Sequence, residues 1–441
     1  MKRLFTTLLT VGALAAATTV PAAAAPPDIV TRLHHLPGVT YRSEDPHPPA
    51  GFREFHLSFR QAVDHRDPRS GTFEQQLTLL HRDTAAPMVV YTNGHWIDST
   101  IAEPTTLLGA DQLDIEHRFF GDSVPQPEIW ANLTVWQSAA DEHEVVNVLK
   151  HLYRGHWLSA GTGEGGEGAI FHRMYFPGDF DGTFADNSPD DVTDHGDSYQ
   201  HFLNDQVATP ECRAALQAVQ IEALKRRPAL EARMAAAADA AGVTFTKDIG
   251  SLDKAYEFNV LDTPFAFWQF ASTSPYNCAN IPPATASDDD IYRFVDVVSG
   301  GSIPGGMLAE ADQNLDPSVP FLYEAGTELG YPVEPQAHLA GLLHYPNQEA
   351  AREYVPRTIP MHYDPQVMRS AAQWVATRGS RLIFLYGSLN PWSANPFRLG
   401  PGSRDSSVHV QQGGDYSASI AALPAAERDG IVSTLHRWAR R

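Results

Sequence analysis

The chain has 441 residues, of which 53 are acidic and 32 are lysine or arginine, and its formal net charge is -21. A chain of this length can bury a large core and has room for a main domain with an insertion. Because nucleic acids and anionic membranes repel an acidic protein, the charge argues against both as partners.

The first 25 residues have the pattern of an export signal. Met1-Lys2-Arg3 is positively charged, residues 4–20 are largely apolar, and Pro21 precedes a short alanine tract. This pattern predicts a secretory signal peptide over residues 1–25, too short for a stable membrane anchor. No later run is apolar for long enough to span a bilayer, so we expect a secreted, extracellular protein.

The exported chain keeps two cysteines, Cys212 and Cys278. An oxidising compartment favours a disulfide between them. The alternative is two buried thiols, since cysteine is among the residue types most often buried.

The N-terminal part predicts strands after an irregular start. Residues 26–51 are rich in proline and predict an extended lead-in. Residues 52–59 and 73–80 roughly alternate apolar and polar side chains, which predicts two antiparallel strands. The apolar run 86–94 ends in a turn signal and is typical of a strand buried on both faces.

Helices and strands then alternate. Residues 112–121 predict a strand with a charged end, and apolar residues recur at roughly helical spacing over 136–154. A second strand-helix step ends near 179–185. This alternation predicts a parallel sheet with helices on its faces.

The stretch 158–168 reads LSAGTGEGGEG and has the layout of a strand end, a tight turn and the start of a helix. In an α/β-hydrolase this turn has the pattern G-x-S-x-G and presents a nucleophilic serine. Here Gly163 occupies the position of the serine, between Gly161 and Gly165. Covalent chemistry therefore cannot start at this residue.

The loop Asn93-Gly94-His95 follows the buried strand over 86–94. In a hydrolase of this type, the equivalent loop supplies backbone donors for an oxyanion. His95 is a candidate for a role there. The alternative is an ordinary loop histidine, because the two ring nitrogens find hydrogen-bond partners easily.

Residues 190–366 differ in character from the rest. The alanine-rich segment 212–241 predicts a helix, and 288–299 predicts a short amphipathic helix. Parallel-strand runs do not recur here, so we expect an inserted helical cap over 190–366 that roofs a substrate cleft. The core would then consist of 52–189 and 367–441.

The sheet pattern returns near the C-terminus. Residues 366–377 predict a helix, 380–387 a buried strand, 408–410 a last strand and 419–440 a closing helix. The whole pattern predicts an α/β protein with the α/β-hydrolase fold, a mainly parallel sheet and an inserted helical cap.

Several motifs carry a resemblance to a known family. They are QAVDHR at 61–66, LTLLHRDT at 77–84, FPGDFDGT at 176–183, AYE at 255–257, YVPR at 354–357 and NPWSANPFRLG at 390–400. Through them the chain resembles the secreted tripeptidyl aminopeptidases of actinomycetes, a group of serine peptidases, from about residue 55 to residue 438. The motif EHRFFG at 116–121 more distantly resembles lysosomal prolyl carboxypeptidase and its dipeptidyl peptidase relatives.

The resemblance implies acyl transfer by Ser, Asp and His in that chain order. The nucleophile position then falls on Gly163, the acid on Asn390 and the base on Tyr416. Asparagine lacks the negative charge that orients an imidazolium, and tyrosine, with a reference pKa of about 10, is a poor base at neutral pH. Removal of such a triad lowers kcat by roughly 10⁶.

Other ionisable residues lie near these positions. Glu164 and Glu167 begin a predicted helix and would share one face, where the helix dipole favours their charged forms. They would polarise a substrate or hold an amine, or else face solvent. Asp415, beside Tyr416, would act as a base or pair with an amine, or would be an ordinary loop residue.

The aminopeptidase resemblance implies an acidic cleft that recognises a free amino terminus. Glu116 is a candidate ligand-binding residue, and its alternative role is a buried ion pair with His117 or Arg118. The other candidates for ligand binding are Asn93, Gly94 and Trp392. No H-E-x-x-H motif occurs, so we expect neither a catalytic metal nor a cofactor.

Three functional hypotheses remain open. The first is a secreted pseudopeptidase that binds a peptide or small molecule without cleaving it. The second is a hydrolase fold repurposed for noncovalent acid-base catalysis, with Glu164, Asp415, Tyr416 and His95 as candidates. The third is residual tripeptidyl aminopeptidase activity through residues that the sequence does not reveal.

Overall fold

A computed structural model describes residues 28–67, 69–192, 198–271, 276–302 and 305–440. The predicted signal peptide lies outside the described residues. The described residues form a sheet with the strand order β1-β2-β3-β5-β4-β6-β7-β8-β9. The strands are β1 (Val39–Glu44), β2 (Arg53–Ala62), β3 (Thr72–His81), β4 (Met88–Thr92), β5 (Asp111–Ile115), β6 (Trp157–Thr162), β7 (Gly182–Asp186), β8 (Leu382–Gly387) and β9 (Ser407–Gln411).

The sheet changes from antiparallel to parallel along its width. Strands β1, β2, β3 and β5 pair antiparallel in that order. From β5 onward each neighbouring pair is parallel. Every residue of β4, β5 and β8 is buried, as expected for parallel strands that are covered on both faces. The prediction of an α/β fold with a mainly parallel sheet is confirmed.

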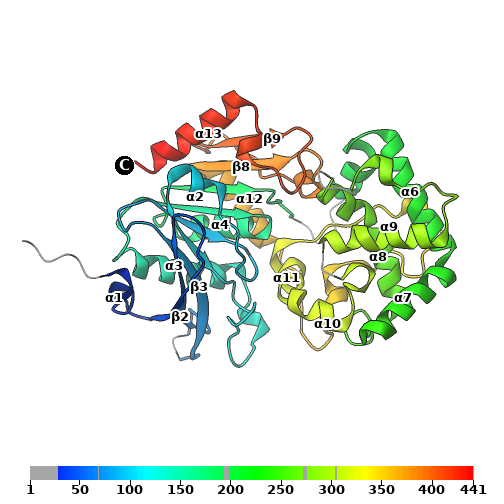
Figure 1. The fold of residues 1–441 in the computed structure, drawn as a ribbon, viewed down its shortest axis with the longest axis horizontal. Helices are drawn as coiled ribbons and strands as arrows, with labels where there is room; N and C mark the ends of the chain where they lie inside the picture. The colour runs from blue at the N-terminus through cyan, green and yellow to red at the C-terminus, as the bar shows by residue number, and fades with distance from the viewer. Residues whose placement is uncertain (1–27, 68, 193–197, 272–275, 303–304, 441) are drawn as a thin grey trace, which may run out of the picture.

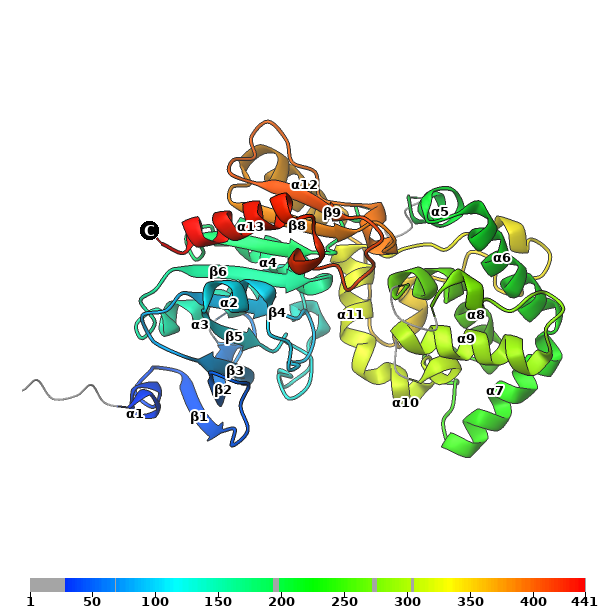
Figure 2. The ribbon, with the colours of Figure 1, turned by 45° about the horizontal axis from the view of Figure 1, so that its top comes forward.

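Helices cover both faces of the sheet, as Figures 1 and 2 show. These helices are α2 (Glu103–Leu108), α3 (Val135–Leu149), α4 (Glu164–Tyr175), α12 (Gln366–Arg378) and α13 (Ala425–Trp438). Successive residues of β8 point to opposite faces of the sheet, and each face has its own layer of helices. Phe384 packs with residues of α4 and α12, whereas Ile383 packs with residues of α13. Helix α3 lies on the same face of the sheet as α4 and packs against β4 and the antiparallel strands.

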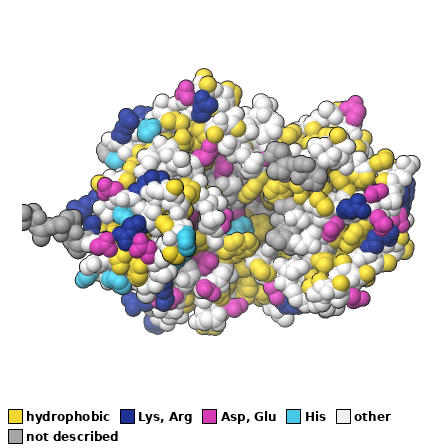
Figure 3. Space-filling model, in the orientation of Figure 1, with side chains coloured by type: hydrophobic (Ala, Val, Ile, Leu, Met, Phe, Trp, Pro, Cys, Tyr) yellow, Lys and Arg dark blue, Asp and Glu magenta, His cyan; other side chains and the backbone are white. Residues whose placement is uncertain are grey.

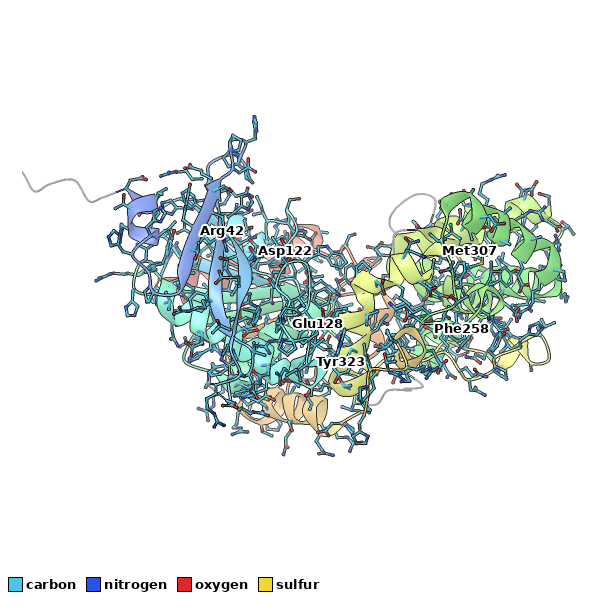
Figure 4. All side chains as sticks on the ribbon, turned by 90° about the horizontal axis from the view of Figure 1, so that it is seen from below. Arg42, Asp122, Glu128, Phe258, Met307 and Tyr323 are labelled. Atoms are coloured by element: carbon cyan, nitrogen blue, oxygen red, sulfur yellow. A yellow bond between two sulfur atoms is a disulfide. The ribbon has the colours of Figure 1, made fainter. Side chains whose placement is uncertain are left out.

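The helices between β7 and α12 lie to one side of the sheet, on the right in Figure 1. They are α5 (Ser198–His201), α6 (Pro210–Lys225), α7 (Arg227–Ala241), α8 (Leu252–Gln269), α9 (Asp288–Ser302), α10 (Asp312–Leu315) and α11 (Val319–Glu324). We call the described residues of 198–361 the cap. In Figure 4, Tyr323 of α11 lies where the cap meets the sheet, while Phe258 and Met307 lie within the cap.

The cap has its own core, which continues into a loop of the sheet region. Phe119 and Leu133, from the segment between β5 and α3, belong to the same buried apolar cluster as Phe258 and Met307. The rings of Trp130 and Tyr323 lie 5.3 Å apart across this junction. The cap boundaries at 190 and 366 stay a prediction.

Two local expectations are wrong. The lead-in over 26–51 contains a short helix, α1 (Ile29–Leu33), which Asp28 caps, and the edge strand β1. The segment 212–241 is helical as expected, and it is divided between α6 and α7 because Pro228 lacks the N–H needed to continue α6. The strand expected over 112–121 ends at Ile115, and Phe119 beyond it has a positive φ of 71°.

In the space-filling view, acidic and basic side chains are interspersed with apolar ones across the visible face (Figure 3). Among the described residues, no helix combines the length and the apolar character needed to cross a membrane.

Candidate functional site

A strained glycine turn joins β6 to α4. Gly163 has φ 56°, a backbone conformation that glycine adopts at little cost and other residues rarely adopt. Its N–H donates to the Asp186 carbonyl at 2.9 Å, and its own carbonyl accepts from the Glu167 N–H at 3.1 Å. The turn thus has the shape of a nucleophile elbow, without a side chain at its apex.

The apex of this turn faces the phenol of Tyr416. A Cβ atom added to Gly163 would lie 2.5 Å from the Tyr416 hydroxyl oxygen, closer than real Cβ contacts. The Tyr416 N–H donates to the Gln269 carbonyl at 3.0 Å, and its carbonyl accepts from the Asn187 amide at 2.9 Å. Burial, and then the nearby Asp186, raise the pKa of Tyr416 far above its ordinary value. Tyr416 is therefore a neutral hydrogen-bond donor and not a base.

Asn390 lies in the loop after β8. It is completely buried, its Oδ1 accepts from the Trp392 N–H at 3.3 Å, and its Nδ2 has no hydrogen-bond partner. The neighbouring Leu389 N–H donates to the Gly414 carbonyl at 2.8 Å, which joins this loop to the loop of Tyr416. The structure therefore gathers Gly163, Asn390 and Tyr416 at the ends of β6, β8 and β9.

The candidate role of Asp415 is wrong. Its side chain is buried and accepts from the Ser417 N–H at 2.9 Å and from the Ser417 hydroxyl at 2.7 Å. It is not among the residues that line the cavity beside Tyr416. Of the loop residues 412–417, Tyr416 is the one that lines the cavity.

A cavity of about 360 Å³ separates the elbow from the cap. From the sheet side it is lined by His95, Trp96, Gly163, Glu164, Glu167, Trp392 and Tyr416. From the cap it is lined by Asp262, Phe265, Glu310, Phe321, Tyr331, Glu334, Glu349 and Tyr354, among others. Among the described residues of this lining, Ser318 is the one serine and His95 the one histidine.

Four carboxyl groups gather on the cap side of this cavity: Asp262, Glu310, Glu334 and Glu349. The three glutamates are at least nine-tenths buried, and the Oε2 atom of each has no hydrogen-bond partner. Burial raises the pKa of Asp262 to about 7 and that of Glu334 to about 8. Burial likewise raises the pKa values of Glu310 and Glu349 well above the ordinary range.

We call these four residues the acidic cluster. The sequence did not reveal it because its members are spread from 262 to 349 without a common motif. The feature of the sequence that could have indicated the cluster is a single acidic residue within a mostly apolar segment. Asp262 in the helix α8 is an example. An empty cluster of this kind stays largely protonated at neutral pH, because several buried like charges are unfavourable.

Glu164 and His95 form a second polar group in the cavity. His95 Nε2 lies 2.9 Å from Glu164 Oε2, and the His95 side chain is 32% exposed while that of Glu164 is 7% exposed. Burial opposes a charge on His95, but the Glu164 carboxylate outweighs it and the pKa of His95 is raised. Beneath this pair, Glu324 of the cap lies 3.5 Å from His117 Nε2.

Glu164 and Glu167 line the cavity and do not face bulk solvent. The expectation that the helix dipole holds Glu167 charged is wrong. Glu167 is 4% exposed, and burial raises its pKa well above the ordinary value. The dipole contributes about 0.3–1 kcal/mol, less than one pKa unit, whereas full burial shifts a pKa by up to about 3–5 units. Burial therefore decides the protonation of Glu167.

Glu116 is not a ligand-binding residue of this cavity. Its carboxylate accepts hydrogen bonds from the Ser123 hydroxyl at 2.6 Å and from the Asp122 N–H at 3.2 Å. Glu116 therefore stabilises the loop to which it belongs. The alternative of an ion pair with its neighbours is also wrong. Arg118 pairs with Asp141 at 2.7 Å, and His117 faces Glu324.

Of the remaining candidates, Trp392 is among the residues that line the cavity, whereas Asn93 and Gly94 are not. Gly94 is pressed against the start of α4, where an added Cβ would lie 2.8 Å from the Gly165 nitrogen. The Asn93 amide nitrogen is buried without a hydrogen-bond partner. Trp392 lines the cavity and packs edge-on against Phe265, with ring centroids 4.9 Å apart. The predicted disulfide between Cys212 and Cys278 is present.

The parallel strand order, the glycine turn between β6 and α4, and the loops gathered beyond β8 and β9 define an α/β-hydrolase. The model of the PS-10 peptidase S37 family matches residues 22–440. The chain therefore belongs to this peptidase family, and the resemblance to the tripeptidyl aminopeptidases is confirmed.

The chain is also similar to several single proteins. The chain is 40% identical over 416 residues to a prolyl tri/tetrapeptidyl aminopeptidase of Streptomyces mobaraensis, which covers 93% of this chain and 85% of the relative. Among solved structures, it is similar to a proline iminopeptidase of Mycobacterium smegmatis, with 13% identity, a TM-score of 0.41, and coverage of 87% and 98% of the two chains. It is also similar to a bacterial heroin esterase, with 12% identity, a TM-score of 0.39, and coverage of 94% and 89%.

Proposed function

We propose that this protein is a secreted member of the peptidase family that has lost its Ser-Asp-His triad and binds a peptide, or a small cationic molecule, without hydrolysing it. The observation that carries the proposal is a single cavity that both the acidic cluster and the Gly163 turn line. The ligand would place a cation in the cluster and extend its chain toward Tyr416.

The acidic cluster matches an ammonium group. An ammonium offers three N–H donors and a positive charge, and the cluster offers three unpartnered glutamate oxygens. Buried charges are tolerated when they are paired and hydrogen-bonded, so a bound amine would stabilise ionised carboxylates that are costly in the empty cavity. The amino terminus of a peptide is the commonest ligand with this chemistry.

The chemistry of the elbow opposes hydrolysis. Gly163 has no nucleophile, Asn390 has no charge, and the Tyr416 phenol stays protonated. Gly163 and Tyr416 face one another, and Asn390 lies in the loop that the Leu389 N–H joins to the loop of Tyr416. The proposal of a pseudopeptidase rests on this combination.

The test is calorimetric titration with a tripeptide amide and with its N-acetylated form. We expect saturable binding of the free amine, a loss of affinity of at least about tenfold on acetylation, and release of amine product no faster than in buffer. Glu334→Gln should weaken binding of the free amine. Glu211→Gln, on an exposed part of the cap, is the matched control and should not. Equal affinities for the two peptides would contradict amine recognition.

A second candidate function is noncovalent acid-base catalysis by His95 and Glu164. It is favoured by their ion pair at 2.9 Å and by the exposure of His95 to the cavity. Turnover of any bound ligand that Glu164→Gln abolishes, while binding persists, would support it over simple binding. Labelling of a specific serine by a fluorophosphonate would instead indicate residual serine peptidase activity.

A further inference from the structure

Two histidines and an aspartate converge behind the sheet, away from the residues that line the cavity. His143 lies on α3, His172 on α4, and Asp179 in the loop between α4 and β7. His143 Nδ1 lies 2.7 Å, and His172 Nε2 2.8 Å, from the same Asp179 oxygen, Oδ2. One ligand atom of each residue lies within 4.8 Å of the other two.

The two rings are fixed in orientation by their surroundings. His172 is completely buried, and its other nitrogen, Nδ1, lies 2.5 Å from Glu142 Oε2. The Asn147 amide donates to His143 Nε2 at 2.9 Å, so Nδ1 of this ring carries the proton directed at Asp179. The ring of Phe176 stacks on His143 at 4.0 Å and packs edge-on against His172 at 5.8 Å. Both imidazoles are therefore held with one nitrogen facing Asp179 Oδ2.

We propose that His143, His172 and Asp179 form a binding site for a divalent transition-metal ion of the zinc type. Neutral imidazole and carboxylate are ligands of such ions, and catalytic or labile sites commonly have three protein ligands and a water. At metal-ligand distances of about 2.0–2.2 Å, tetrahedral ligand atoms lie about 3.3 Å apart. The present separations of 2.7 and 2.8 Å require shifts of about half an ångström.

The surroundings complete the site. A carboxylate on the far nitrogen of a metal-bound histidine orients the ring and raises its basicity, and Glu142 is in this position on His172. The positive charge of Lys150 disfavours a bound cation nearby. However, its Nζ lies 3.6 Å from Asp179 Oδ1, so Asp179 Oδ2 stays available beside the histidines. The His143 side chain is 28% exposed and provides a path from solvent.

Binding exchanges protons for the metal. His143 moves its proton from Nδ1 to Nε2 through solvent, the Asn147 amide turns its oxygen to accept from Nε2, and the proton between His172 Nε2 and Asp179 passes to solvent. Both histidines then bind as neutral imidazoles, and the three ligand atoms hold the ion with a water in the fourth position. The ion would join α3, α4 and the loop before β7. Because α4 begins at the Gly163 turn, the expected role is to stabilise the scaffold of the cavity. The search for H-E-x-x-H could not find these ligands, since they come from three separate segments.

The test uses the full chain after treatment with a chelator and dialysis. Titration with zinc chloride should show one tight equivalent, the thermal midpoint should rise with zinc, and cobalt(II) should give visible absorption bands of a four-coordinate site. His143→Ala, at the exposed ligand, should weaken zinc binding by at least about a hundredfold, and Glu142→Gln by about 10–100-fold.

The matched control is His56→Ala. His56, Asp45 and Glu54 form the other group of possible ligands among the described residues, but His56 is 43% exposed and lies 3.7 and 3.8 Å from the two carboxylates. We expect no loss of the tight equivalent in this variant. No saturable zinc binding by the wild type, equal binding by His143→Ala, or loss of binding in His56→Ala would each overturn the proposal.

Discussion

At the scale of single residues, Gly163 and Tyr416 share a space that only one side chain can fill. The turn requires a positive φ at Gly163, and the phenol of Tyr416 lies against its Cα. Both features oppose a side chain at this position, although the turn itself keeps the shape in which related folds present one. The elbow is therefore adapted to glycine and not merely missing an atom.

We expect Gly163→Ser alone to lower the free energy of unfolding by about 1–3 kcal/mol, because it adds backbone strain and a contact with Tyr416. Tyr416→His in the same chain should recover part of this loss by removing the phenol. Urea denaturation measures both. Gly168→Ser is the control within α4, where an added Cβ has no atom within 4 Å, and it should not destabilise.

Adding Asn390→Asp to Gly163→Ser and Tyr416→His places the three groups of the triad at the three gathered positions. This triple variant should cleave tripeptide amides measurably above the wild type. If the folded triple variant shows no cleavage, the three substitutions are not sufficient to create a hydrolytic site in this cavity.

At the scale of elements, the sequence was most informative where a segment has one dominant pattern. The uniformly apolar β4 and β8 and the glycine turn before α4 were located correctly, because burial on both faces and a positive φ restrict the residue types strongly. The alanine-rich segment 212–241 was expected to be helical, and it is, although its composition did not indicate where α6 ends and α7 begins.

The sequence indicated the glycine turn at Gly163 and the loops that carry Asn390 and Tyr416, whose assignment as triad positions stays a prediction. It did not indicate the chemistry around them. Gly163, Asn390 and Tyr416 follow strand ends, which the parallel sheet brings to one edge. The acidic cluster depends on how cap segments pack, which no local pattern encodes. The predicted roles of Glu116 and Asp415 were wrong because the side chain of a loop residue can form hydrogen bonds within its own loop. Both carboxylates do so.

The disulfide between Cys212 and Cys278 links two segments of the cap covalently. It joins α6 to the segment after α8, across 66 residues of sequence. We expect the double variant Cys212→Ser, Cys278→Ser to lose about 2–4 kcal/mol of unfolding free energy, because the unfolded chain gains the entropy that the closed loop removes. Guanidinium denaturation with and without a reductant measures this. The reductant should reproduce the loss in the wild type and leave the double variant unchanged.

At the scale of the whole molecule, many acidic groups are buried while the chain carries a large negative charge. Burial raises the pKa of Asp191 to about 6, of Asp186 and Asp190 to about 7 and of Glu334 to about 8. Their unfolded values lie near 4. The folded state therefore holds protons that the unfolded state releases, over the range from about pH 4 to pH 8.

Stability should consequently fall as pH rises through this range. The raised pKa of His95 acts in the same direction, because the stability it adds is complete below its unfolded pKa and is lost at higher pH. Asp312 and Asp141, whose pKa values are lowered, add stability that is lost only at more acid pH. We expect a higher thermal midpoint at pH 5 than at pH 8 at equal ionic strength, measured by calorimetry. Glu334→Gln should reduce the difference, and a higher midpoint at pH 8 would refute the expectation.

The close approach of Tyr416 to Gly163 also bears on the history of the fold. A hydroxymethyl group at position 163 and a phenol at position 416 exclude one another, whereas glycine tolerates either histidine or tyrosine opposite it. If an ancestor of this chain carried serine at position 163, the less costly route would begin with replacement of the serine and only then admit the larger aromatic ring. Relatives that combine glycine at the turn with histidine opposite would be the intermediates of this route, whereas a serine facing a tyrosine should be rare.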